Sequence, residues 1–148
     1  MDTSNTIPNG FPQSIKTMTD TEVLDLDATV GIITRTKDRP VLLKRALESV
    51  IHQSYEDWRL VIVNDGGDPA TVDRLVNHYA PQFRGRVSII HNPVSLGMEA
   101  ASNKGIQSVR TRYLAIHDDD DSWAPEFLTI AVAEIEQIRQ KFPQVAGV

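Results

Sequence analysis

Short apolar runs alternate with longer amphipathic stretches along most of this chain. Apolar runs at 30–33, 60–63, 87–90 and 113–117 have few polar interruptions, which is typical of strands buried on both faces of a sheet. Between them, apolar residues recur at helical spacing, which predicts helices at about 40–51, 70–79, 98–109 and 125–141. Strands that alternate with helices predict parallel βαβ units, and hence an α/β fold with helices on both faces of the sheet.

The two ends of the chain depart from this alternation. Residues 1–27 are rich in Thr, Ser, Asn, Asp and Pro without sustained periodicity, so we expect a polar N-terminal extension before a domain at 28–148. Residues 145–148 have the character of a strand that is just beginning. We therefore expect the sequence to be a fragment of a longer fold, truncated on its C-terminal side.

The composition of the chain narrows the class of protein. With 148 residues, 41% of them hydrophobic and 24% charged, the chain can build one domain with its own core. The absence of cysteine excludes disulfides, thiolate zinc sites and a cysteine nucleophile. A net charge of −5 without a Lys/Arg cluster argues against nucleic-acid binding. No apolar stretch reaches the ~20 residues of a membrane span, so we expect a cytoplasmic location, which leaves room for peripheral membrane association of the full-length protein.

Four consecutive aspartates follow the last predicted strand. Their carboxylates repel one another, and oxygen ligands of this kind suit a hard divalent cation such as Mg²⁺ or Mn²⁺. In an extended segment, Asp118 and Asp120 would point one way and Asp119 and Asp121 the other, so the first pair would hold the ion. The alternative is a solvated turn or a helix cap, because Asp is also favourable near a helix start.

Polar residues also follow two other predicted strands. Thr36, Lys37 and Asp38 come after the first strand, and Asn64 and Asp65 come after the second. Parallel strands bring these ends to one edge of the sheet, where open α/β folds bind ligands. Taken alone, the segment after the second strand could be a simple turn, whereas the convergence of all three segments predicts a binding site.

Five short segments occur in an order and spacing typical of one enzyme family. They are Ile32–Pro40, similar to V-I-I-P-T-Y-N-R-P; Ala46–Val50 with Gln53–Tyr55, similar to A-L-x-S-[VIL]…Q-[ST]-[YF]; Val61–Gly67, similar to V-V-D-D-G-S; Asn92–Ile106, similar to N-x-G…A-x-N-x-G-[IL]; and His117–Asp121 with Pro125 and Leu128, similar to L-D-x-D-D…P-x-x-L. Through them, residues 30–128 resemble the nucleotide-binding half of a family 2 glycosyltransferase. The resemblance implies the GT-A fold, a Rossmann-like three-layer α/β/α arrangement around a mostly parallel sheet.

The resemblance also implies an activity. Such a domain binds a nucleotide-diphosphate sugar, usually a UDP-sugar, through a divalent metal at an Asp-x-Asp motif. It transfers the sugar, with inversion in most members, to a hydroxyl of a glycan, a lipid-linked or another acceptor, as in polysaccharide biosynthesis. The resemblance places the acceptor site and the catalytic base in a second half, which we expect beyond Val148.

Site residues follow from the resemblance position by position. Asp65 would hydrogen-bond the base, Asp120 would be the main metal ligand, and Asp118 would contact the ribose or the hydrated metal. The implied nucleotide-binding residues are Thr36, Lys37, Asp38, Asp65, Gly97, Asn103, Asp118 and Asp119, and the implied metal ligands are Asp120 and Asp118.

Some positions depart from the family pattern, and three of them bear on the site. Lys37 stands in place of a common Tyr, Asn64 in place of the first Asp of a pair, and His117 in place of an apolar residue. Two other functions stay open: a non-catalytic nucleotide-sugar-binding module, and a sugar nucleotidyltransferase. The second would carry a Gly-rich basic phosphate loop after the first strand, and residues 34–39 contain no glycine.

Overall fold

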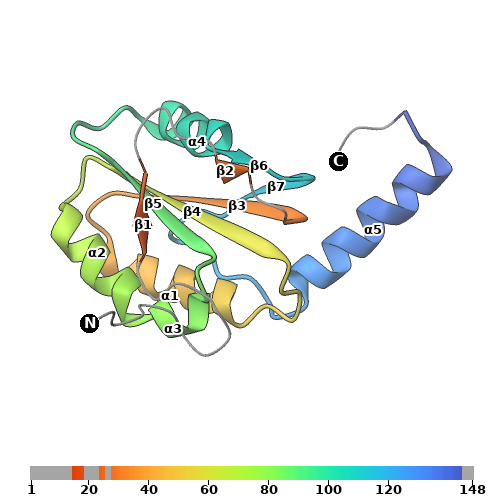
Figure 1. The fold of residues 1–148 in the computed structure, drawn as a ribbon, viewed down its shortest axis with the longest axis horizontal. Coiled ribbons are helices and arrows are strands. Elements are labelled where there is room, and N and C mark those ends of the chain that lie inside the picture. Colours follow the sequence, from red (N-terminus) through yellow and green to blue (C-terminus); the bar gives the residue numbers. More distant parts are fainter. Residues whose placement is uncertain (1–14, 19–23, 26–27, 145–148) are drawn as a thin grey trace, which may run out of the picture.

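A computed structural model describes residues 15–18, 24–25 and 28–144 of the protein. A five-stranded, fully parallel sheet in the order β1-β5-β4-β3-β7 forms its centre (Figure 1). Its strands are β1 (Lys16–Thr17), β3 (Val30–Thr36), β4 (Trp58–Asp65), β5 (Val87–Asn92) and β7 (Tyr113–Ile116). The four strands predicted from the apolar runs are confirmed, and so is their parallel arrangement.

Helices cover both faces of this sheet (Figure 1). The helices α1 (Pro40–Ile51), α2 (Pro69–His78) and α3 (Ala80–Phe83) lie on one face, α4 (Met98–Gln107) lies on the other, and α5 (Phe127–Lys141) extends away beyond the β7 edge. The three-layer α/β/α architecture expected from the sequence is therefore confirmed.

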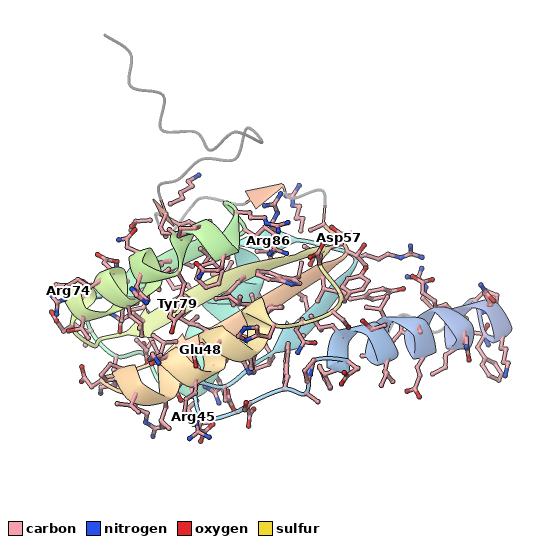
Figure 2. All side chains as sticks on the ribbon, turned by 90° about the horizontal axis from the view of Figure 1, so that it is seen from below. Arg45, Glu48, Asp57, Arg74, Tyr79 and Arg86 are labelled. Carbon is pink, nitrogen blue, oxygen red and sulfur yellow. The ribbon has the colours of Figure 1, made fainter. Side chains whose placement is uncertain are left out.

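Each strand of the sheet supplies two cores, because neighbouring side chains point to opposite faces. In β3, Ile32 packs toward α1 and α2 with Leu47 and Val76, whereas Ile33 belongs to the smaller cluster beneath α4 with Ala101. All five side chains are at most 1% exposed. On the larger face, the Tyr79 hydroxyl at the end of α2 also donates to Glu48 of α1 at 2.6 Å (Figure 2). The doubly buried sheet explains why its strands read as continuous apolar runs.

Glycine sets how closely α4 approaches the sheet. A Cβ at Gly105 would lie 2.5 Å from the Cγ2 of Ile33 and 3.1 Å from the Cγ2 of Val63. A larger residue would push the helix outward. Gly105 therefore allows α4 to pack directly against β3 and β4, next to the ends of the strands.

Helix starts follow ordinary capping chemistry. Pro40 and Pro69 occupy the first turns of α1 and α2, where a missing N–H costs nothing. Asp68 caps α2 by accepting a hydrogen bond from the Thr71 amide at 3.1 Å. The first strands and helices of the domain thus end and begin within a few residues of each other, which keeps the loops at the strand ends short.

Some predicted boundaries differ from the structure. Helix α4 ends at Gln107, and β6 (Val109–Arg110) follows it and pairs with β2 (Leu24–Asp25). Within the predicted N-terminal extension, β1 adds an edge strand beside β5. Two-residue strands are too short to leave a periodic pattern, so sequence alone could not reveal them. The strand expected at 145–148 lies outside the described residues.

Candidate functional site

A cavity of about 410 Å³ opens where β3, β4 and β7 end. It is lined by Arg35, Thr36, Lys37, Arg39, Asp65, Ser95, Gly97, Met98, Asp118, Asp119 and Asp120. Seven residues predicted from the sequence as site residues are among them. We call this space the strand-end cavity.

Two predicted site residues lie elsewhere among the described residues. Asp38 has a left-handed backbone (φ 52°) and lines a smaller neighbouring cavity of about 180 Å³ between α1 and α2. Its side chain accepts a hydrogen bond from the Asp68 amide at 3.3 Å, which joins the loops after β3 and β4. Asn103 is exposed on α4, and its neighbour Ser102 faces the site instead. The nucleotide-binding roles of Asp38 and Asn103 stay predictions.

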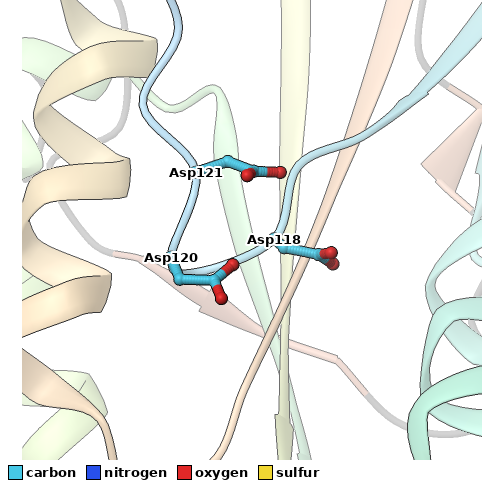
Figure 3. A group of neighbouring side chains, drawn as sticks. All are labelled: Asp118, Asp120 and Asp121. Carbon is cyan, nitrogen blue, oxygen red and sulfur yellow. The ribbon is translucent and has the colours of Figure 1, made fainter.

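The aspartates after β7, Asp118–Asp121, form an acidic loop rather than an extended segment. The amide of Asp121 donates to the carbonyl of Asp118 at 3.0 Å, which closes a turn. This turn brings single carboxylate oxygens of Asp118, Asp120 and Asp121 within 4.8 Å of one another (Figure 3). The strict alternation of an extended chain therefore does not apply, and Asp121 joins the pair predicted from the sequence.

Asp119 faces the other way and holds the acidic loop in place. Its side chain is 7% exposed and accepts hydrogen bonds from Thr36 Oγ1 at 2.9 Å and from Arg39 Nη1 at 3.4 Å. Thr36 is the last residue of β3, and Arg39 directly precedes α1. Asp119 therefore ties the acidic loop to the loop between β3 and α1, across the strand-end cavity.

The donor set of the acidic loop fits a divalent cation with oxygen ligands. Three carboxylates converge, two of them exposed to incoming ligands. In addition, the buried Oδ1 of Asp118 accepts no hydrogen bond from any described residue. This oxygen instead faces the Arg35 guanidinium, whose Nη2 lies 2.8 Å away, so its charge is already partly balanced by a cation of the protein. Asp118, Asp120 and Asp121 are the residues that could hold Mg²⁺ or Mn²⁺.

Asp65 shows the opposite arrangement. Its Oδ1 accepts hydrogen bonds from Asn92 Nδ2 (2.9 Å) and the Leu96 amide (2.8 Å), and its Oδ2 accepts from Ser95 Oγ (2.8 Å) and the Gly97 amide (3.1 Å). Burial raises the pKa of this carboxyl group, but the four hydrogen bonds together outweigh burial and lower the pKa. Asp65 thus organises the whole Asn92–Gly97 loop, and its predicted contact with a base would have to share oxygens that are already engaged.

The replacement of an aspartate by Asn64 has a structural reason. Its amide nitrogen donates to the Gly67 carbonyl at 2.9 Å, while its amide oxygen accepts from the Gly67 amide at 3.1 Å. The same nitrogen lies 3.0 Å from Nδ1 of His91, whose Nε2 lies 2.8 Å from Asp73. A carboxylate could accept but not donate. Asn64 therefore stabilises the turn after β4 as both a hydrogen-bond donor and a hydrogen-bond acceptor.

His117 is a packed residue at the end of β7. It is fully buried, its Nε2 lies 3.4 Å from Ser49 Oγ, and its ring contacts Trp123 at 4.2 Å between centroids. Burial lowers its pKa, against the smaller opposing influence of Asp121 and Asp118. This favours a neutral ring, and the ring contact and the nearby hydroxyl indicate a structural role.

Four residues that line the cavity were not predicted as site residues from the sequence: Arg35, Arg39, Ser95 and Met98. Ser95 and Met98 reach the cavity only because Asp65 gathers the Asn92–Gly97 loop, a contact some 30 residues apart in the chain. Arg35 could have been noticed, because it stands at the position of a proline in the motif that resembles Ile32–Pro40.

A parallel three-layer domain with an acidic loop at its strand ends has the architecture of a GT-A nucleotide-binding domain. The chain belongs to glycosyl transferase family 2, whose model matches residues 30–145. Among the described residues, no helix is both long and apolar enough to cross a bilayer.

Two of the curated relatives of the chain are named as putative glycosyltransferases. The chain is 30% identical over 109 residues to the putative colanic acid biosynthesis glycosyl transferase WcaA of Escherichia coli, covering 74% of this chain and 38% of the relative. It is also 30% identical over 105 residues to the putative glycosyltransferase EpsE of Bacillus subtilis, covering 71% of this chain and 37% of the relative. The chain thus spans well under half the length of these relatives.

Solved structures share the fold at lower identity. TarS 1-349 of S. aureus in complex with UDP-GlcNAc aligns with a TM-score of 0.66 and 19% identity, covering 74% of this chain and 31% of that one. The mannosyltransferase PcManGT of Pyrobaculum calidifontis, in complex with GDP-Man and Mn²⁺, aligns with a TM-score of 0.63 and 21% identity, covering 76% and 34%.

Proposed function

We propose that this domain binds a nucleotide-diphosphate sugar in the strand-end cavity and serves as the donor-binding part of a glycosyltransferase. The observation that carries the proposal is the meeting, around one cavity, of the acidic loop and basic side chains from the neighbouring strand end. Carboxylates alone would repel a diphosphate. Carboxylates that hold a divalent ion, with Lys37 and Arg39 beside them, suit the binding of one.

The parts of the donor can be assigned to parts of the cavity. The diphosphate lies near Asp120 and Asp118, which hold Mg²⁺ or Mn²⁺, with Asp121 as a further ligand. The nucleoside lies toward Thr36 and Asp65, and the Asn92–Gly97 loop supplies the cavity wall at Gly97. When bound, the metal supplies Lewis-acid stabilisation of the departing diphosphate.

The transfer step is a single displacement at the anomeric carbon. The acceptor hydroxyl oxygen bonds to this carbon while the bond from the carbon to the diphosphate oxygen breaks, and a general base takes the hydroxyl proton. Inversion follows from one such displacement. We place the base and the acceptor site in the part of the protein that corresponds to the remaining length of the relatives, of which this chain covers 38% or less in the two cited.

A UDP-sugar is the preferred donor in this proposal. TarS is described with UDP-GlcNAc and PcManGT with GDP-Man and Mn²⁺, so related folds bind both nucleotides. The acceptor class proposed here is a glycan, a lipid-linked or another hydroxyl compound, in line with the biosynthetic name of WcaA.

Calorimetric titration with nucleotides tests the proposal. UDP with Mn²⁺ should bind the wild-type domain, GDP should bind more weakly, and D120N should lower the affinity for UDP by more than about tenfold because it removes a metal-ligand charge. The matched control is E134Q, which neutralises an exposed acid on α5 far from the acidic loop. The proposal fails if neither nucleotide binds the wild-type domain with or without Mn²⁺.

Donor hydrolysis separates an enzyme from a binding module. The short span of the chain relative to its relatives keeps a non-catalytic nucleotide-sugar-binding module as a second candidate. Slow release of UDP from a UDP-sugar by this domain, lost in D120N, would support catalytic donor activation. Tight binding without any release, by this domain and by a longer natural relative alike, would favour the binding module.

A further inference from the structure

A fixed positive charge lies beside the acidic loop. Arg35 comes from the end of β3, and its Nη2 lies 2.8 Å from Oδ1 of Asp118. Oδ1 of Asp118 accepts no hydrogen bond from the described residues, so the interaction is an ion pair of two charges in contact. The Arg35 side chain is 20% exposed and that of Asp118 36%.

Helix α4 holds the other side of the same guanidinium. Nη1 of Arg35 donates to Ser102 Oγ at 2.9 Å and to the Met98 carbonyl at 3.3 Å. The planar guanidinium therefore bridges α4 and the acidic loop with two different nitrogens. Its position is fixed from both sides, so its charge stays at Asp118 rather than sampling solvent.

The other cations of the strand-end cavity are placed differently. Arg39 lies 3.4 Å from Asp119, the buried aspartate that faces away from the cluster, and its own side chain is 56% exposed. Lys37 is exposed. The cation in contact with a proposed metal ligand, among these three, is Arg35.

We propose that Arg35 is a positioning residue that shares Asp118 with the divalent ion, and that it thereby weakens metal binding by the nucleotide-free domain. This inference rests on the proposed metal site. Two cations on one carboxylate repel each other at contact distance, and partial burial limits the screening of that repulsion. An incoming diphosphate adds negative charge beside both cations, so the metal is bound tightly only together with the donor.

A purely structural ion pair makes a different prediction. If Arg35 only anchored the acidic loop to α4, its removal would loosen the loop and weaken metal binding. Competition for Asp118 predicts the reverse, because removal of the guanidinium releases a ligand. The sign of the change in metal affinity therefore separates the two roles.

Binding of Mn²⁺ to the nucleotide-free domain, followed by the electron paramagnetic resonance signal of free Mn²⁺, provides the test. R35M, which keeps the length of the side chain and removes its charge, should raise the affinity for Mn²⁺ roughly tenfold. In a D118N background the same substitution should change the affinity less than twofold, because the shared carboxylate is gone. R45M is the control, since Arg45 is an exposed arginine on α1 (Figure 2).

The outcomes separate this inference from the proposed function. Unchanged or weaker Mn²⁺ binding by R35M, with wild-type circular dichroism, overturns the inference even if UDP and Mn²⁺ bind the wild-type domain. An equal effect of R35M in the D118N background overturns it as well. If neither UDP nor GDP binds the wild-type domain with or without Mn²⁺, the proposed function fails and the inference with it. R35Q is the second neutral variant, and the same increase is required of it if R35M does not fold.

Discussion

Two sets of aspartates lie at the same edge of the sheet and are used in opposite ways. Asp65 accepts four hydrogen bonds from the Asn92–Gly97 loop and is almost fully buried. In the acidic loop, by contrast, Asp120 and Asp121 are exposed, and the Oδ1 of Asp118 accepts no hydrogen bond from the described residues but forms an ion pair with Arg35. Carboxylates saturated by protein donors build the site, and carboxylates left open can bind a cation.

The largest expected difference between the two sets is in stability. D65A leaves two backbone amides and two side-chain donors without their acceptor, so we expect the free energy of unfolding to fall by about 2–4 kcal/mol. D120A removes an exposed charge from a repulsive cluster and should change stability by less than about 0.5 kcal/mol. Urea unfolding of the two variants measures both. Equal losses of unfolding free energy in D65A and D120A would contradict the view that Asp65 stabilises the fold while Asp120 is free to bind a cation.

The close packing of α4 against the sheet provides the next test of which residues stabilise the fold. G105A places a Cβ 2.5 Å from the Ile33 side chain, so we expect a loss of about 1–3 kcal/mol from overpacking. The matched control on the same helix is N103A, at an exposed position, with a change within about 0.5 kcal/mol. Urea unfolding measures this pair too, and UDP titration of N103A tests the nucleotide role that the resemblance implies. No loss in G105A would mean that α4 can shift without cost.

The lowered pKa of Asp65 makes the contribution of this residue to stability depend on pH. A carboxyl group with a lowered folded-state pKa contributes stability that is fully present above its unfolded pKa of about 3.9 and is lost as pH falls through the lower folded value. D65N cannot titrate. We therefore expect the stability gap between wild type and D65N to be constant from pH 7 to about 5 and to narrow below about pH 4. If the stability difference between wild type and D65N stayed constant down to pH 3, the Asn92–Gly97 loop would not favour the ionised form of Asp65.

The smallest effect concerns the third carboxylate of the acidic loop. Because a turn, not an extended segment, brings Asp121 to the cluster, D121N should weaken Mn²⁺ binding by roughly three- to tenfold, less than D120N. Its stability should stay within about 0.5 kcal/mol of wild type. Metal titration of both variants checks the ranking, and an unchanged affinity in D121N would restore the simple Asp118–Asp120 pair.

The sequence predicted the parts of the molecule that depend on local patterns. Strands buried on both faces leave continuous apolar runs, so four strands and their parallel direction were predictable. The two-residue β1 left no such pattern. The polar strand ends were also predictable. Their placement at one edge of the sheet follows from the parallel arrangement, but Asp38 and Asn64 do not line the strand-end cavity.

The hydrogen-bond and ion-pair partners of the site residues were not predictable from the sequence. Whether an aspartate is saturated or open depends on donors distant in the chain: Asp65 is bound by residues 27 to 32 positions later, and Asp119 by Thr36. The turn that recruits Asp121 depends on a single backbone hydrogen bond. The placement of Arg35 depends on its hydrogen bonds to Met98 and Ser102 of α4, 63 and 67 positions later in the chain.

The central claim is that the open aspartates bind a metal together with a nucleotide diphosphate. The most direct measurement is an anomalous difference map from crystals of the domain grown with UDP and Mn²⁺. The account predicts a manganese peak within about 2.5 Å of a carboxylate oxygen of Asp120, with the diphosphate beside it in the strand-end cavity. A manganese peak away from the acidic loop, or UDP bound outside this cavity, would contradict it.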